Sequence, residues 1–158
     1  MKSTPLTIIV IGASGDLAQR KIIPALFALA SRGLLPDHYT IVGFARTAMS
    51  DDEFRTRCME HLTCRYTPQS NCAEHMTRFL ERCRYFSGQY DNPDTWFELH
   101  RFLHGIEQAP VADRMFYLAV PPDVFTPVAR AIGNAGMVSC DEAKGWSRII
   151  IEKPFGRD

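Results

Sequence analysis

Short runs of apolar and β-branched residues alternate along this chain with longer stretches in which apolar residues recur every three or four positions. The short runs predict buried strands, because a strand covered on both faces of a sheet has no polar side. The longer stretches predict amphipathic helices. Strands are expected at 7–11, 39–44, 84–87, 115–120 and 148–151, and helices at 17–32, 50–62, 73–82, 95–103 and 123–133.

Local signals mark several of these boundaries. Pro24 lies inside the first helix and should bend or divide it, and Gly33 is a natural stop at its end. Ser50 and Glu53 form a capping box, and Asp94 is expected to cap the helix that follows it. Strands that alternate with helices predict an α/β fold, a doubly wound parallel sheet with right-handed crossovers. A length of 158 residues is that of one domain, 1–158.

The turn after the first strand carries the clearest chemical signal. Gly12, Gly15 and Ala18 follow the apolar run with the spacing G-x-x-G-x-x-A, and a helix begins there. This is a shortened form of the fingerprint of a Rossmann-like dinucleotide-binding domain. Gly12 permits the tight turn, Gly15 lets the backbone approach a pyrophosphate, and the helix N-terminus offers free N–H groups. The alternative is a glycine-rich turn with no ligand.

The end of the second strand indicates which dinucleotide is bound. An acidic residue there would hold the ribose 2′-hydroxyl of NAD, whereas an arginine accommodates the 2′-phosphate of NADP. Here the strand runs into Arg46 and Thr47, and no carboxylate occurs before Asp51. We therefore predict NADP as the cofactor, with Arg46 as the phosphate ligand and Thr47 as a hydroxyl donor beside it. An ordinary exposed arginine is the alternative.

Two later loops should reach the same crevice, because ligands of open parallel sheets bind at the carboxyl ends of the strands. Asp91 and Asn92 follow the third strand and are predicted neighbours of the adenine side, although a turn selected for Asx chemistry is equally consistent. Lys153 follows the fifth strand, where its ammonium could pair with a sugar hydroxyl or a phosphate. The alternatives are a solvated lysine at position 153 and a structural role for Glu152 before it.

The composition of the chain mainly excludes kinds of partner and kinds of site. Eighteen basic and 18 acidic side chains give no net charge, so no nucleic-acid or membrane surface is expected as a partner. No apolar stretch approaches the ~20 residues of a membrane span, and no signal peptide is expected. Five cysteines without a C-x-x-C pair predict a reduced, cytoplasmic protein with unpaired thiols. His100 and His104 share a helix face, but no third ligand is near, so no metal site is predicted.

Four segments together resemble the coenzyme domain of the glucose-6-phosphate dehydrogenase family. They are GASGDLAQRKIIPALF (12–27), VGFAR (42–46), FYLAVPP (116–122) and IIIEKPFGRD (149–158). They occur in the family's order and span the whole chain. The combination of G-x-x-G-D-L-A with E-K-P-F-G-R-D is much more selective than a glycine motif alone.

The resemblance implies an oxidoreductase that converts glucose 6-phosphate to 6-phosphogluconolactone with NADP, in the pentose phosphate pathway of glucose metabolism. It implies that Arg46 holds the 2′-phosphate and that Lys153 reaches both the nicotinamide and the sugar, with Pro154 after a cis peptide. It also implies a pyrophosphate site of eight consecutive residues: Gly12, Ala13, Ser14, Gly15, Asp16, Leu17, Ala18 and Gln19.

The chain departs from the family in one large respect. The family continues into an α+β substrate domain that carries the motif R-Y/I-D-H-Y-L-G-K, whose histidine is the general base. None of the five histidines here lies in such a motif, so no catalytic residue is assigned and the base is expected beyond Asp158. We therefore expect a chain that binds NADP and catalyses little alone. A homo-oligomer is expected for the full-length protein, with its contacts mostly outside this chain.

Two other functions stay open at this point. A standalone NADP-binding or regulatory module would use the same crevice without catalysis. A sugar oxidoreductase of the superfamily that also places E-K-P after the fifth strand is disfavoured, because the first turn reads G-A-S-G-D-L-A and lacks the full G-x-G-x-x-G.

Overall fold

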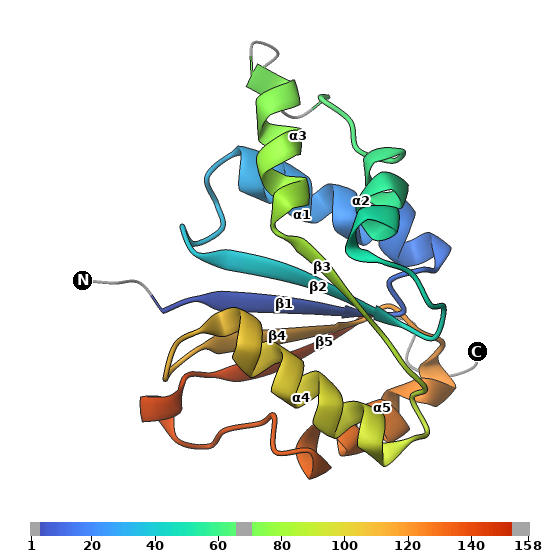
Figure 1. Ribbon diagram of the computed structural model, residues 1–158, viewed down its shortest axis with the longest axis vertical. Helices are drawn as coiled ribbons and strands as arrows, with labels where there is room; N and C mark the ends of the chain where they lie inside the picture. Colours follow the sequence, from blue (N-terminus) through green and yellow to red (C-terminus); the bar gives the residue numbers. More distant parts are fainter. Residues whose placement is uncertain (1–3, 66–70, 153–158) are drawn as a thin grey trace.

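A computed structural model describes residues 4–65 and 71–152 of the chain. Five strands form a parallel sheet in the order β3-β2-β1-β4-β5 (Figure 1). The strands are β1 (Leu6–Ile11), β2 (Tyr39–Ala45), β3 (Cys83–Ser87), β4 (Asp113–Leu118) and β5 (Ser147–Ile151). The doubly wound α/β fold predicted from the sequence is therefore confirmed.

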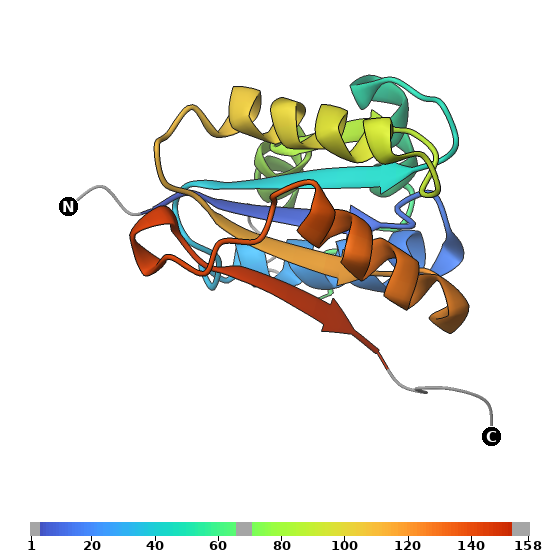
Figure 2. The ribbon, with the colours of Figure 1, turned by 90° about the horizontal axis from the view of Figure 1, so that it is seen from below.

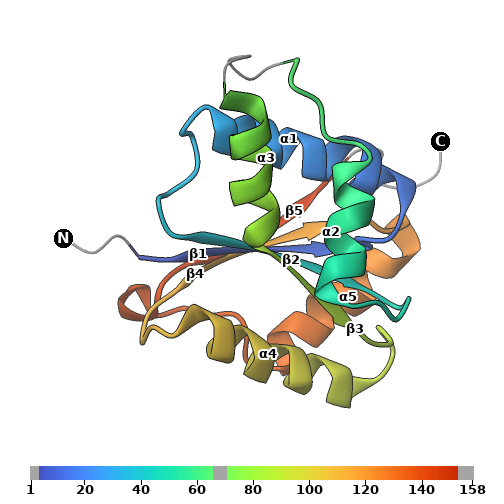
Figure 3. The ribbon, with the colours of Figure 1, turned by 45° about the horizontal axis from the view of Figure 1, so that its top comes forward.

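Helices cover both faces of the sheet (Figure 1 and Figure 3). One layer contains η1 (Ala18–Ile22), α1 (Ile23–Ser31), α2 (Asp51–Met59) and α3 (Cys72–Glu81), and the other contains α4 (Pro93–Glu107) and α5 (Pro122–Asn134). In the central strand β1, Ile8 and Val10 belong to the core of the first layer, and Ile9 and Ile11 belong to the core of the second. Because successive residues of a strand face opposite sides, both layers require an apolar residue, and β1 has no polar break.

The strand order creates a crevice beside β1. After β3 the chain crosses the sheet and forms β4 on the other side of β1 from β2. The connections that follow β1 and β4 therefore leave the sheet toward opposite faces, and ligands of open parallel sheets bind at such a point. Figure 2 shows the turn after β1 and the start of α5 at the same end of the sheet.

The helix after the glycine turn is divided, as Pro24 predicted. Ala18–Ile22 forms a π-helical turn, and the α-helix proper begins at Ile23 with Pro24 in its first turn. At the other end, Gly33 has a φ of +68° and its N–H donates to the Ala30 carbonyl at 3.0 Å. Gly33 is thus the C-terminal stop that the sequence indicates.

The boundaries predicted for α4 were wrong at both ends. Asn92, and not Asp94, is the N-cap: its side chain accepts the N–H of Asp94 at 3.0 Å. The helix also continues to Glu107, whose carboxylate receives the guanidinium of Arg114 at 2.9 and 2.7 Å and the hydroxyl of Thr7 at 3.0 Å. These partners come from β4 and β1, so the last turn of α4 is stabilised by contacts that the helix's own sequence does not encode.

The prediction of unpaired thiols was wrong for two of the five cysteines. Cys64 and Cys72 form a disulfide with their Cα atoms 5.7 Å apart, because the fold brings the end of the α2 segment against the start of α3. Cys58 and Cys83 are buried free thiols and Cys140 is an exposed one. Burial raises the pKa of Cys58 to about 12, so this thiol stays protonated at neutral pH.

Within residues 4–65 and 71–152, no helix is both long and apolar enough to cross a membrane. The same residues contain no group of three histidine, cysteine, aspartate or glutamate side chains placed to hold a metal ion.

Gly43 allows three elements to meet in the middle of β2. A Cβ atom at position 43 would lie 2.5 Å from Cζ of Phe54 on α2 and 2.9 Å from Cβ of Ala13 in the glycine turn. Both neighbours are fully buried, so neither can move into solvent. The absence of a side chain at position 43 therefore sets how closely α2 and the turn approach the sheet.

We predict that Gly43→Ala lowers the free energy of unfolding by about 1–3 kcal/mol, the usual cost of overpacking a core. Gly105→Ala is the matched control, because a Cβ at this position within α4 meets nothing within 4 Å. The control should raise the free energy of unfolding by roughly 0.5–1 kcal/mol through helix propensity. Urea denaturation of both variants checks this, and equal shifts in the two would contradict the assignment.

Candidate functional site

The glycine turn after β1 is attached to the neighbouring strand β2. The N–H groups of Gly12 and Ala13 both donate to the carbonyl of Phe44, at 2.8 and 3.2 Å. Gly12 has a φ of +86°, and a Cβ there would lie 2.3 Å from the carbonyl oxygen of Ala119 after β4. Position 12 therefore excludes every side chain, both by its backbone conformation and by its contact with the next strand.

The remainder of the turn presents unused backbone donors. The N–H of Gly15 closes the turn onto the Gly12 carbonyl at 3.0 Å. In the described part of the chain, the N–H groups of Ser14, Asp16 and Leu17 donate to no other residue. They stand at the start of a helical segment, where the dipole favours negative charge. Free N–H groups at the start of a helical segment are suited to bind an anion.

Other residues of the predicted pyrophosphate segment support the turn from behind. Ala18 and Gln19 are buried, and Nε2 of Gln19 donates to the Ala13 carbonyl at 2.8 Å. Asp16 directs its carboxylate into solvent, where it forms an exposed ion pair with Arg20 at 3.6 Å. The backbone of this segment is therefore available to a ligand, whereas the side chains of Ala18 and Gln19 are not.

A cavity of about 300 Å³ lies between this turn, the end of β2 and the start of α5. Backbone N–H groups of the glycine turn border one side of the cavity. Arg46 and Thr47 border a second side, and apolar residues that follow β4 border a third. The lining residues are Gly12, Ser14, Gly15, Ala45, Arg46, Thr47, Tyr90, Ala119, Val120, Pro121 and Val124. A cavity that combines backbone N–H donors, the guanidinium of Arg46 and an apolar wall is suited to bind a nucleotide.

The side chain of Arg46 is available to a ligand. It is exposed, and no carboxylate in the described part of the chain forms an ion pair with it. The centroid of the Tyr90 ring lies 6.0 Å from its guanidinium carbon. An arginine without an acidic partner at the rim of an anion cradle is suited to bind a second anionic group.

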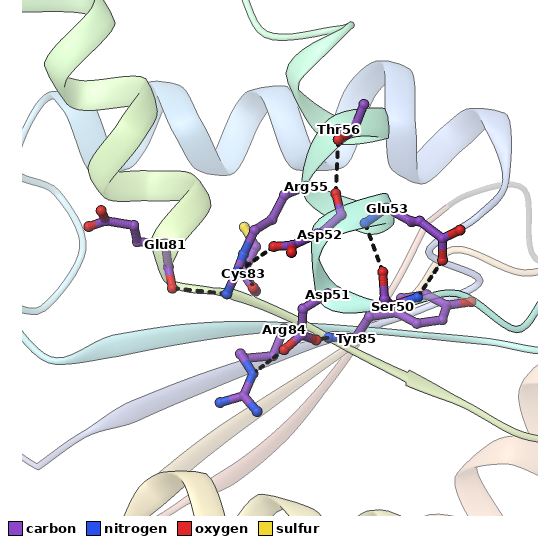
Figure 4. Close-up of polar contacts among 10 residues, drawn as sticks. All are labelled: Ser50, Asp51, Asp52, Glu53, Arg55, Thr56, Glu81, Cys83, Arg84 and Tyr85. Carbon is purple, nitrogen blue, oxygen red and sulfur yellow. Dashed lines mark hydrogen bonds and ion pairs between the residues drawn. The ribbon is translucent and has the colours of Figure 1, made fainter.

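The first carboxylate after Arg46, that of Asp51, is bound by residues of β3 (Figure 4). Asp51 Oδ2 lies 2.7 Å from Nε of Arg84, and Oδ1 accepts the N–H of Tyr85 at 2.7 Å. Both of its oxygens are therefore engaged on β3. Asp51 is not free to hold a ribose 2′-hydroxyl as the acidic residue of an NAD site does.

The loop that carries Arg46 is fixed at both ends. The predicted capping box is present: Ser50 Oγ accepts the N–H of Glu53 at 3.1 Å, and Glu53 Oε2 accepts the N–H of Ser50 at 2.7 Å (Figure 4). The hydroxyl of Tyr85 donates to the carbonyl of Thr47 at 2.5 Å. Burial raises the pKa of Tyr85 to about 12, so this hydroxyl keeps its proton and remains a donor at neutral pH.

The loop after β3 contributes to the cavity a side chain other than the two that the sequence predicted. Tyr90 lines the cavity, whereas Asp91 lines an adjacent hollow with Trp96 and Pro127. The side chain of Asn92 caps α4, which is the Asx role left open by the sequence. The signal for it in the sequence is an aromatic residue, Tyr90, directly before the two polar residues Asp91 and Asn92.

The remaining predicted residue, Lys153, lies outside the described residues, as does Pro154. The residue before it, Glu152, accepts a hydrogen bond from the hydroxyl of Tyr117 on β4. Burial and this carboxylate together raise the pKa of Tyr117 to about 12. Glu152 therefore has a structural partner, in agreement with that alternative.

A family model described as "Glucose-6-phosphate dehydrogenase, NAD binding domain" matches residues 9–158. The chain belongs to the glucose-6-phosphate dehydrogenase family. A glucose-6-phosphate 1-dehydrogenase of *Nicotiana tabacum* is 49% identical over 157 residues, which are 99% of this chain and 26% of that protein. One from *Spinacia oleracea* is 48% identical over 153 residues, 97% of this chain and 26% of that protein.

A solved structure shares the fold of this glucose-6-phosphate dehydrogenase family member. It is described as "Glucose-6-phosphate dehydrogenase in complex with its substrate glucose-6-phosphate". The TM-score is 0.85 at 31% identity, over 99% of this chain and 32% of the solved one. The chain thus spans about a quarter of the length of the relatives and about a third of the solved structure.

The family assignment supports NADP as the coenzyme. The residues present fit that group, since the turn cannot accept a Cβ at Gly12 and offers unused N–H groups at Ser14, Asp16 and Leu17.

The cytoplasmic location predicted from the sequence was wrong. The tobacco and spinach relatives are both named as chloroplastic. Cysteine content describes the folded domain and does not determine the compartment to which a protein is delivered.

We predict that Gly15→Val abolishes dinucleotide binding and leaves the fold intact. A Cβ at position 15 has one close neighbour, the Gly12 carbonyl at 3.3 Å, and would stand where the ligand approaches. Gly12→Ala is the contrasting variant, because its strain and its clash with Ala119 should lower the melting temperature as well. Calorimetric titration and thermal unfolding separate the two effects, and normal binding by Gly15→Val would place the phosphates elsewhere.

Proposed function

We propose that residues 1–158 form the NADP-binding domain of a glucose-6-phosphate 1-dehydrogenase. That enzyme oxidises glucose 6-phosphate at C1 to the lactone, in the pentose phosphate pathway, with NADP as hydride acceptor. The observation that carries the proposal is the cavity itself, in which an anion-binding turn, an unpaired arginine and an apolar wall converge. The family match over residues 9–158 supports it.

Selection of NADP over NAD is assigned to Arg46. Its guanidinium offers a planar fork of donors that matches the oxygens of a phosphate monoester. Asp51, the nearest carboxylate in the sequence, is occupied by Arg84 and the Tyr85 N–H and competes for neither the arginine nor the ribose. Thr47 borders the same side of the cavity and is the proposed second donor.

The pyrophosphate is assigned to the turn from Gly12 to Leu17. Its negative charge would be met by the N–H groups of Ser14, Asp16 and Leu17, while Ala13, Ala18 and Gln19 keep the turn in place from behind. The bound dinucleotide supplies the hydride acceptor. The chain itself binds and orients that group and shields it with the apolar wall of Val120 and Val124.

The general base is not assigned to this chain. All five histidines lie within the described residues, and none of them lines the cavity. His100 and His104 border a separate hollow with Arg114 and Lys144. The base and most of the sugar-phosphate site would therefore come from the remainder of the full-length protein, and Lys153 would contribute to the sugar and nicotinamide side.

For the full-length protein we further propose glucose 6-phosphate as substrate, a plastid location and a homo-oligomeric state. The substrate is that of the solved relative, and the location is that of the plant relatives.

We predict that Arg46→Ala weakens NADP binding about tenfold or more and leaves NAD binding nearly unchanged. A charge-assisted contact to a phosphate is worth roughly 1.5–3 kcal/mol, and NAD lacks that phosphate. Calorimetric titration of both cofactors measures the two affinities. Equal losses for both would remove Arg46 from the role of 2′-phosphate ligand.

A second prediction concerns catalysis. The purified 158-residue chain should bind NADP but show no measurable NADPH absorbance with saturating glucose 6-phosphate. Loss of a general base alone costs roughly 10²- to 10⁴-fold, and loss of substrate positioning adds to it. In the full-length protein, Lys153→Ala should lower turnover and spare most of the NADP affinity. Robust turnover by the 158-residue chain would require a base among its own histidines.

A further inference from the structure

Tyr90 occupies the point where the glycine turn, the end of β2 and the loop after β3 meet. Its backbone is fixed from α4, since Nε1 of Trp96 donates to the Tyr90 carbonyl at 2.9 Å. Its ring stands edge-on to that of Phe44, with centroids 5.2 Å apart and an interplanar angle of 89°. Two independent contacts therefore define where the ring lies.

The hydroxyl end of the ring reaches the glycine turn. Tyr90 Oη donates to the carbonyl of Phe44 at 3.4 Å, a long hydrogen bond to the same oxygen that accepts the N–H groups of Gly12 and Ala13. Burial raises the pKa of Tyr90, while the Gly12 N–H and the Arg46 guanidinium both act to lower it. The two groups that lie on either side of the crevice thus both interact with this one side chain.

The ring of Tyr90 also contacts the guanidinium of Arg46. The guanidinium carbon lies 6.0 Å from the ring centroid, at the outer limit of a cation–π contact. No carboxylate of the described residues holds this guanidinium, and the side chain is exposed. A long exposed arginine must lose rotamer freedom when it binds, and a contact that restricts it beforehand lowers that cost.

We propose that Tyr90 is a specificity-determining positioning residue, whose ring holds Arg46 at the crevice so that it meets a phosphate monoester on the 2′ position of the ribose. The inference rests on the proposed function, in which Arg46 is the 2′-phosphate ligand. It adds that an aromatic side chain at position 90 strengthens the preference for NADP. Since NAD has no 2′-phosphate, loss of this support should change the ratio of the two affinities and not only their magnitude.

The test is a double-mutant cycle between positions 90 and 46, measured by calorimetric titration of NADP and NAD. Tyr90→Leu should lower the ratio of NADP to NAD affinity about two- to fivefold, the factor of an exposed cation–π contact. In an Arg46→Ala background, Tyr90→Leu should leave the ratio unchanged, because the group that it positions is already absent. An equal change of the ratio in both backgrounds would overturn the inference.

Tyr39→Leu is the matched control. Tyr39 begins β2, at the end of the strand opposite to Arg46, and its ring carries its own guanidinium contact, with Arg82 at 4.5 Å. This variant should leave the NADP to NAD ratio as it is in the unmodified chain. If Tyr39→Leu lowers the ratio as much as Tyr90→Leu, the effect is a general loss of stability and the inference fails.

Tyr90→Phe keeps the test decisive should the leucine variant not fold. It retains the ring and removes the hydroxyl, so the ratio should stay within about twofold of the unmodified value. A loss of the ratio as large as that of Arg46→Ala would show that the ring does not carry the effect.

The two proposals fail separately. An unchanged ratio in Arg46→Ala alone rejects Arg46 as the ligand. A normal effect of Arg46→Ala with no effect of Tyr90→Leu rejects only the role of Tyr90.

Discussion

The carbonyl oxygen of Phe44 joins the two sides of the crevice, because it accepts the N–H groups of Gly12 and Ala13 and lies within reach of the Tyr90 hydroxyl. Phe44 belongs to β2 and the glycine turn follows β1, so this oxygen sets the distance between the phosphate cradle and the end of the strand that carries Arg46. It also uses two donors that would otherwise face a ligand. The N–H groups that remain for the proposed anion site are therefore the next ones along the chain, beginning at Ser14.

Electrostatics at the crevice depend on which charges are already neutralised. Asp51 is held by Arg84 and the Tyr85 N–H, and the buried Glu107 is held by Arg114, so these carboxylates have their partners inside the fold. Arg46 has none among the described residues. A domain without net charge thus presents a locally positive site, and a zero formal charge says nothing about the sign of the potential at one cavity.

The geometry of the described residues fits the binding of a dinucleotide, and no histidine among them lines the cavity. Rigid elements position the cofactor site: β1, β2 and β4 supply the turn, the arginine and the apolar wall, and the sheet fixes their spacing. Glu152 is connected to β4 through Tyr117 at the end of β5, where the strand leaves the sheet. Hydride transfer needs both a held cofactor and a placed base, and in the proposed function the described residues of this chain provide the first of these.

The sequence by itself determined the succession of strands, the division of the first helix, the glycine turn and the family, because periodicity, caps and short motifs are local properties of the chain. Only the tertiary structure decided which side chains share a cavity. It placed Tyr90 and not Asn92 at the crevice, extended α4 through contacts with β1 and β4, and paired Cys64 with Cys72. Each of these outcomes depends on the approach of segments that are distant in sequence, and no local spacing encodes that approach.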